Sequence, residues 1–225
     1  GAVAFSFCGR VTFPKPADRN VNMMPFVMGE RASVPEELKA YYDQIVTKCP
    51  MSNEWGEVCY LTVQESFIEM GQTQRRGGLH VEAGGTQGSF APGVMANWGG
   101  GLDEEYHGGI FLASSVECTT EVFEDVVDHE YGTVNQHGDI EHLRRYLGEG
   151  ILLDAGELIW LTDRTPHEAL PQGRSSYRQF FRLVTSNISL WFEEHSTPNP
   201  LVELPSHVQV VRGSKFQKEE DSACK

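Results

Sequence analysis

The chain has 225 residues, a length that suits one domain and lets it bury a large core without disulfide or metal staples. Its formal net charge of −14 repels phosphate backbones and anionic lipid surfaces, and no stretch approaches the roughly 18 apolar residues of a membrane span. We therefore expect no nucleic acid and no membrane as partners, although a single arginine inside a pocket can reverse the local field and bind a small anion.

Helical spacing is present in two short stretches. Residues 2–13, which precede both, are apolar and β-rich. Ser33 to Glu36 matches a capping box with proline early in the helix, and it predicts an amphipathic helix over 37–48 that packs outside a sheet. A second helix is predicted over 139–148. Its apolar stripe consists of Ile140, Leu143, Tyr146 and Leu147.

Most of the remaining sequence consists of short β-rich runs separated by glycines. The predicted strands are 58–63, 79–83, 109–114, 121–127, 151–154, 157–162 and 177–191. Many short strands with glycine between them are typical of a sandwich or a jelly roll. We predict a mainly β fold, a double-stranded β-helix (jelly roll, cupin-like) with a few flanking helices. It would form a single catalytic domain over 1–197, followed by a polar tail over 198–225.

A His-x-Glu pair lies inside one of these predicted strands. His80 and Glu82 are two positions apart, and side chains in a strand alternate between faces, so both point to the same side. An imidazole nitrogen and a carboxylate oxygen on one face can occupy adjacent positions around a metal ion. Flanking glycines at 77–78 and 84–85 let backbone and ligands approach closely.

A second histidine follows a predicted strand pair. The run from Asp154 to Ala169 is interpreted as a strand, a tight turn at Gly156, a second strand, and His167 at the start of a third. Two histidines and one carboxylate on one octahedral face leave three positions open, the arrangement found in non-haem Fe(II) oxygenases.

Three arginines follow His167 closely: Arg174, Arg178 and Arg182. An arginine on the next strand can clamp a carboxylate with two parallel hydrogen bonds, which the far carboxylate of an iron-chelating 2-oxoacid requires. Arg178 and Arg182 share one face of the predicted strand, so both can line the pocket.

The sequence resembles the Fe(II)/2-oxoglutarate-dependent dioxygenase superfamily over about residues 58–192. The family pattern is His-x-Asp/Glu, a long interval, a distal histidine, and an arginine about ten residues later. Here 85 positions lead from Glu82 to His167, and 11 more to Arg178. The resemblance implies His80, Glu82 and His167 as iron ligands and catalytic centre, and Arg178 as the 2-oxoglutarate clamp.

The resemblance also implies the cofactors and partners. They are Fe(II), 2-oxoglutarate as co-substrate, O₂, and ascorbate as a further candidate. The primary substrate would be a small molecule that is hydroxylated, desaturated or cyclised. The carboxylate is Glu82 where aspartate is commoner, and Gln179 follows the arginine where some branches have Arg-x-Ser. Arg174 and Arg182 therefore remain alternatives for the clamp.

Two other functions fit the same predicted fold. A cupin-like metal dioxygenase or isomerase would keep the three ligands without depending on Arg178. A non-catalytic jelly-roll binding module would hold no metal.

His107 is a rival ligand because it lies beside glycines and a strand. Trp98, Tyr106 and Trp191 either line a pocket or, as is commoner for aromatic residues in a β-fold, belong to the core. Gln72, Gln74, Arg75 and Arg76 either face substrate or lie at a strand edge. The remaining histidines are interpreted as loop or surface residues: His129, His137, His142, His195 and His207.

Five widely spaced cysteines without a C-x-x-C pair indicate neither a zinc site nor a disulfide framework. Free thiols suit a reducing compartment, and the first ten residues lack the basic region of a signal peptide. We therefore expect a cytoplasmic location. The sequence leaves the oligomeric state open.

Overall fold

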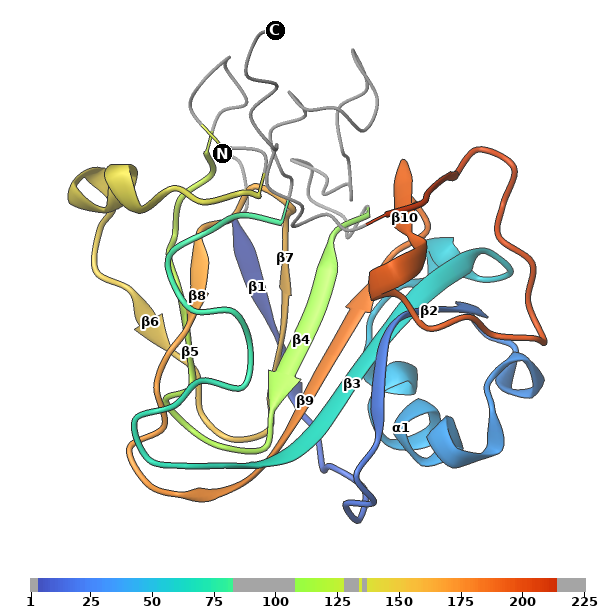
Figure 1. Cartoon of the computed structure of the whole chain (residues 1–225), viewed down its shortest axis with the longest axis horizontal. Helices are drawn as coiled ribbons and strands as arrows, with labels where there is room; N and C mark the ends of the chain where they lie inside the picture. Colours follow the sequence, from blue (N-terminus) through green and yellow to red (C-terminus); the bar gives the residue numbers. More distant parts are fainter. Residues whose placement is uncertain (1–3, 83–107, 128–133, 135–136, 214–225) are drawn as a thin grey trace, which may run out of the picture.

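A computed structural model describes residues 4–82, 108–127, 134 and 137–213 of the chain (Figure 1). Within these residues the fold is mainly β, with antiparallel sheets and few helices, as predicted. Six strands form the larger sheet. In pairing order they are β1 (Phe5–Arg10), β7 (Glu157–Leu161), β4 (Ile110–Ser114), β9 (Ser176–Val184), β3 (Val58–Ile68) and β2 (Asn20–Val27).

Strand alternation gives the large sheet two unlike faces. One face is apolar and packs under the helical segment that follows β2. Its buried side chains include Phe26, Leu61, Phe111, Trp160 and Phe181. The opposite face carries a second apolar cluster with Tyr60, Leu112, Ile159, Phe180 and Val184. Val122 of β5 also belongs to that second cluster, so this face is turned toward the smaller sheet.

The smaller sheet consists of β6 (Ile151–Leu152), β5 (Thr120–Val122) and β8 (His167–Ala169), all antiparallel. A third apolar cluster lies beside it and contains Leu79, Val81, Phe123, Val127, Val134 and Ile140. A two-stranded parallel pair, β10 (Leu190–Phe192) with β11 (Gln209–Val211), completes the described strands.

The predicted helix over 37–48 is broken into three pieces. They are a 3₁₀ helix at Glu36–Leu38, the α-helix α1 (Lys39–Gln44) and a 3₁₀ helix at Val46–Lys48. Its apolar side is buried against the large sheet, as expected. The predicted capping box does not form, because the hydroxyl of Ser33 accepts from the Val27 amide and donates to the Glu30 carbonyl. Ser33 instead ends a separate 3₁₀ helix at Arg31–Ser33.

The second predicted helix is a 3₁₀ helix over Glu141–Tyr146. Ile140 and two partly buried leucines, Leu143 and Leu147, do pack into the third cluster, but Tyr146 is exposed and does not belong to the stripe. Two further short 3₁₀ helices occupy Ser52–Glu54 and Glu193–His195. No helix in the described part of the chain is both long and apolar enough to cross a membrane.

Several predicted strands differ from the structure. Residues 79–82 form no regular strand, although His80 makes isolated β-bridges with Asp139 and His167. β5 (Thr120–Val122) covers only two residues of the predicted strand over 121–127. The predicted strand over 177–191 is two strands, β9 and β10. β2 and β11 were not predicted.

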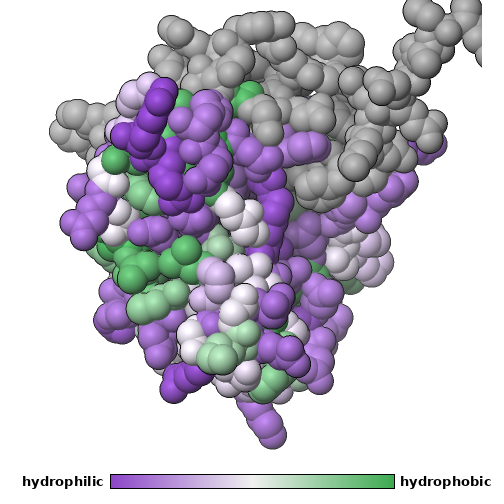
Figure 2. All heavy atoms as spheres, turned by 60° about the vertical axis from the view of Figure 1, so that its left-hand side comes forward, coloured by the Kyte–Doolittle hydropathy of each residue, from purple (hydrophilic) through white to green (hydrophobic). Residues whose placement is uncertain are grey.

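The tail predicted from residue 198 is packed against the domain as far as the described residues extend. The Asn199 amide donates to the carbonyls of Pro25 and Ser33, and β11 pairs with β10. Packed structure therefore continues beyond the expected boundary at residue 197. Figure 2 shows mostly hydrophilic side chains on the face it presents, with apolar ones in small patches.

Candidate metal centre

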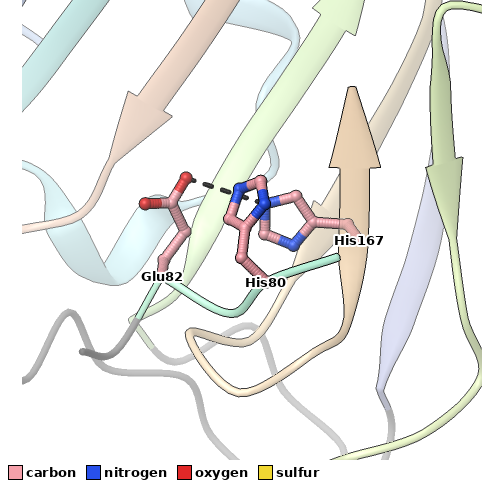
Figure 3. Close-up of side chains that lie close together, drawn as sticks. All are labelled: His80, Glu82 and His167. Carbon is pink, nitrogen blue, oxygen red and sulfur yellow. Dashed lines mark ion pairs between the residues drawn. The ribbon is translucent and has the colours of Figure 1, made fainter. Parts of the chain in front are cut away.

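The three side chains predicted as metal ligands lie together. His80 and Glu82 follow the long loop after β3, and His167 is the first residue of β8. One potential ligand atom from each residue lies within 4.8 Å of the other two, and Figure 3 shows the Glu82 carboxylate pointing toward the imidazole rings. This group could hold a metal ion.

Backbone pairing positions the two histidines. The His80 amide donates to the His167 carbonyl at 3.1 Å, and the His167 amide donates back at 3.0 Å. The Val81 amide donates to the carbonyl of Gly138 on the other side. The segment is thus held between β8 and residues 138–140. Although it is not a regular strand, its side chains alternate: Val81 enters the third apolar cluster, while its two neighbours face the candidate site.

Both imidazoles are oriented by backbone carbonyls. His80 Nδ1 lies 2.7 Å from the Gly78 oxygen, and His167 Nδ1 lies 2.9 Å from the Thr165 oxygen. A carbonyl only accepts, so each Nδ1 carries a proton and Nε2 is the ring nitrogen that can bind a metal ion. Burial, followed by the charge of His167, lowers the pKa of His80 to about 3, which keeps its ring neutral.

The carboxylate is held in its ionised form by an arginine. Burial alone would raise the pKa of Glu82, but Arg182, at 2.8 Å from Oε1, and the neighbouring His167 hold it well below its usual range. His167 Nε2 lies 3.7 Å from the same oxygen. The donor set is therefore two imidazole nitrogens and one carboxylate.

A cavity of about 610 Å³ opens beside this group. The large sheet contributes residues of β2, β3, β4 and β9, and the smaller sheet contributes residues of β5 and β8. The rest of the wall comes from β10, the segments after β3 and β10, and His137. Its polar side chains include Gln64, Gln74, Thr120, His137, Glu168 and His195, and its apolar ones include Leu112, Phe180 and Trp191.

The three arginines proposed as clamps occupy different environments. Arg178 is 1% exposed and lines the cavity. Its guanidinium donates to the hydroxyls of Ser114 and Thr119 and to the Gln74 side-chain oxygen, and burial lowers its pKa to about 10. Arg182 also lines the cavity and pairs with the Glu82 carboxylate. Arg174 lies outside the cavity, with an exposed guanidinium 3.4 Å from Glu117.

The loop before His80 contributes more to the cavity than the sequence indicated. Gln74, Arg75 and Arg76 all line it, whereas Gln72 does not. His137 and His195 line it as well, although both were interpreted as loop residues. The sequence carries no periodic signal for either histidine, because each one reaches the cavity through packing against residues that are far away in the sequence.

The other predicted residues divide into two groups. His142 and His207 are exposed, as expected, and Trp191 is buried but also lines the cavity. The remainder lie outside the described residues: Trp98, Tyr106, His107 and His129.

Comparison with protein-family models finds no match for this sequence, and comparison with curated proteins finds none either. Among solved structures, the chain is similar to AviO1 from Streptomyces viridochromogenes Tue57, with a TM-score of 0.41 and 11% sequence identity. The alignment covers 88% of this chain and 94% of that one.

Proposed function

We propose that this protein is a non-haem Fe(II)- and 2-oxoglutarate-dependent oxygenase that oxidises a small molecule. The observation that carries the proposal is the convergence of His80, Glu82 and His167 beside a cavity that also contains Arg178. Among the described residues, no carboxylate forms an ion pair with that buried guanidinium.

The donor set fits Fe(II). Two imidazole Nε2 atoms and one ionised carboxylate match the facial arrangement of such iron sites, which leaves positions open for other ligands. The Nδ1 contacts to backbone carbonyls are the second-shell support that metal-binding histidines usually have. Fe(II) held there would supply the reaction of O₂ with a 2-oxoacid and a substrate C–H bond.

Arg178 is the best clamp for the far carboxylate of 2-oxoglutarate. Its partners are neutral, and an isolated buried charge is costly, so a carboxylate ligand would supply the missing counter-charge. The Thr120 hydroxyl, 3.5 Å from its Nη2, stands where it could also donate to that ligand. Arg182 is less suitable because its guanidinium already forms an ion pair with Glu82. Arg174 is less suitable because it lies outside the cavity.

The overall chemistry balances with these reactants. A substrate R–H, O₂ and 2-oxoglutarate would give R–OH, succinate and CO₂. Desaturation or ring closure would release water in place of the inserted oxygen. The protein would orient the 2-oxoglutarate through Arg178 and hold the substrate near the three ligands. The cavity's apolar wall would limit water.

We also propose that the fold is a double-stranded β-helix forming one catalytic domain. Successive strands pass between the two sheets: β4 to β5, β6 to β7, and β8 to β9. This alternation supports the jelly-roll interpretation, and it explains how residues of β8 and β9 come to face one cavity.

Succinate formation from 2-oxoglutarate, with Fe(II), ascorbate and air, tests the proposal. The wild-type protein should turn over slowly even without its primary substrate. His167→Ala should abolish turnover and lower divalent-metal affinity by at least about 100-fold, because even second-shell changes cost roughly 10–100-fold. Arg178→Gln should bind metal normally but raise the KM for 2-oxoglutarate about 10–100-fold, since hydrogen bonds to charged groups contribute about 1.5–3 kcal/mol.

Other results would point elsewhere. Metal bound through the three ligands, with no 2-oxoglutarate binding at any concentration, would favour the cupin-like dioxygenase or isomerase. A wild-type protein whose metal affinity equals that of His167→Ala would exclude the triad and leave the binding module.

A further inference from the structure

Four arginines line the cavity: Arg75, Arg76, Arg178 and Arg182. Two of them have charge partners. Arg76 lies 2.5 Å from Asp139, and Arg182 lies 2.8 Å from Glu82. Arg75 and Arg178 form no ion pair with any residue in the described ranges.

Arg75 is held in place by neutral groups. Its Nη1 donates to the side-chain oxygen of Gln64 at 2.9 Å, and its guanidinium lies 5.0 Å above the ring of Phe180. That ring also lies 5.4 Å from the guanidinium carbon of Arg178. Cation–π contacts orient an arginine but do not neutralise its charge. Among the residues that the structure describes, Gln64 is the one hydrogen-bond acceptor of the Arg75 guanidinium, which leaves its other N–H groups for a ligand.

The electrostatics of the cavity favour an anion next to Arg75. Burial, followed by the charge of Arg182, lowers the pKa of Arg75 to about 9, and Arg178 lowers it further while Glu82 opposes the shift. Like charges that flank one ring repel each other, and a bound anion relieves that repulsion. This positive region exists within a chain of formal net charge −14.

The two arginines are suited to different ligands. Arg178 is almost fully buried on β9, whereas Arg75 is partly exposed on the loop five residues before His80. A volume of 610 Å³ lies within the roughly 300–1,000 Å³ of drug-sized ligand pockets, which leaves room for more than a five-carbon diacid.

We propose that Arg75 binds an anionic group, a carboxylate or a phosphate, on the primary substrate. The identification of the ligand as the substrate rests on the proposed function. The identification of the bound group as an anion rests on the charge and contacts of Arg75. Arg75 positions one end of the substrate, so that the rest of the molecule extends toward His80, Glu82 and His167. Gln64 and Phe180 orient the guanidinium for this contact.

Small anions test this assignment without knowledge of the natural substrate. The probes are 3-phenylpropanoate and phenyl phosphate, with neutral 3-phenylpropanamide as the matched control. The protein is loaded with Mn(II) and saturating 2-oxoglutarate in the absence of oxygen, and broadening of the probe's ring-proton NMR signals reports binding near the metal. We expect at least one anion to bind and the amide to fail, and the preferred anion distinguishes a carboxylate from a phosphate.

Substitutions locate the contact. Arg75→Gln should weaken the anionic probe at least about 10-fold, as expected for loss of a charge-assisted hydrogen bond, and Arg75→Lys should restore part of the affinity. Arg31→Gln, which removes the same charge from an exposed pair with Asp43, should have no effect on the probe. Arg75→Gln should also raise the KM for 2-oxoglutarate less than Arg178→Gln does.

Three results would overturn the assignment: equal binding of amide and anion to the wild-type protein, unchanged anion affinity in Arg75→Gln, or an equal rise in the 2-oxoglutarate KM in both variants. The last result would place Arg75 in the co-substrate site. A separate measurement distinguishes failure of the oxygenase proposal from failure of the anion site. If the protein binds no metal, an anion-selective rise in melting temperature that Arg75→Gln abolishes would retain the anion site and reject the chemistry.

Discussion

The two faces of the large sheet are built from the same strands but have opposite characters. On β9, Gln179, Phe181 and Leu183 point to the face beneath α1, where apolar packing leaves no described side chain of the strand exposed. The alternate residues Arg178, Phe180 and Arg182 line the cavity. One strand thus contributes one set of side chains to the buried core and the other set to the cavity wall. Substitutions on the two faces should therefore separate stability from function.

Neighbouring phenylalanines of β9 give the largest expected contrast. Phe181 is 0% exposed within the covered face, so Phe181→Ala should cost about 3–5 kcal/mol of unfolding free energy. Phe180 borders the cavity, so Phe180→Ala should cost less stability, because water can reach the space it leaves. It should also weaken anion binding by releasing Arg75 and Arg178 from its ring.

Urea unfolding of both variants, together with titration of 3-phenylpropanoate and phenyl phosphate, checks this contrast. Equal stability losses, or a loss of anion affinity confined to Phe181→Ala, would contradict the separation of stability and binding between the two faces.

Much of this division was predictable from alternation, and the rest was not. The period of two in β9 places Arg178 and Arg182 on one face, and the His-x-Glu spacing brings two candidate ligands to one side even without a regular strand. Strand β2 was missed because Pro25 and an irregularity between Val21 and Met24 interrupt its pattern. An edge strand tolerates both.

The partners of the arginines could not be read from local sequence. Arg182 pairs with Glu82, a hundred positions away, and Arg75 meets Phe180 and Gln64 from a loop. Such contacts depend on how the loop after β3 crosses from the large sheet to β8. The broken helix at 36–48 is a similar case, because its apolar spacing was correct but the Ser33 hydroxyl is used by the preceding turn.

The backbone at Gly138 packs closely against the segment that carries His80 and Glu82. Gly138 has φ +83°, and a Cβ there would lie 2.1 Å from the Val81 carbonyl oxygen, between two candidate ligands. Gly138→Ala should therefore displace His80 and Glu82, lower metal affinity, and cost about 1–3 kcal/mol beyond the left-handed backbone penalty. Gly71→Ala is the matched control, because Gly71 has φ +82° with open space around its Cβ position. Similar metal affinities in the two variants would show that the contact at Gly138 does not position the ligands.

A buried carboxylate on the covered face gives a smaller, pH-dependent effect. Burial opposes ionisation of Glu65, but the amides of Arg19 and Ala17 and the side chains of Tyr41 and Gln179 lower its pKa below the ordinary value of 4.5. Its stabilisation is therefore present above about pH 4.5 and is lost as the pH falls through the folded-state pKa.

Glu65→Gln should cost about 1–3 kcal/mol at neutral pH, the contribution of hydrogen bonds to a charged group, and less at low pH. Denaturant unfolding of both proteins between pH 7 and pH 3 measures the difference. A difference that grows on acidification would reverse the assignment of the depressed pKa, while metal affinity at neutral pH should change little because Glu65 lies on the face away from the cavity.

Substitution of Arg174 should have the smallest effect, because this residue lies outside the cavity. Its guanidinium is exposed, its ion pair with Glu117 is long at 3.4 Å, and it does not line the cavity. Exposed pairs contribute little because water screens them and ordering two long side chains costs entropy. Arg174→Gln should change the unfolding free energy by less than about 0.5 kcal/mol and the KM for 2-oxoglutarate by less than about two-fold. Steady-state succinate assays measure the KM for 2-oxoglutarate in Arg174→Gln and Arg178→Gln under one set of conditions.

A larger rise in KM for Arg174→Gln would mean that the carboxylate clamp is formed by a loop that reaches the cavity only with ligand bound, because the described position of Arg174 cannot account for it.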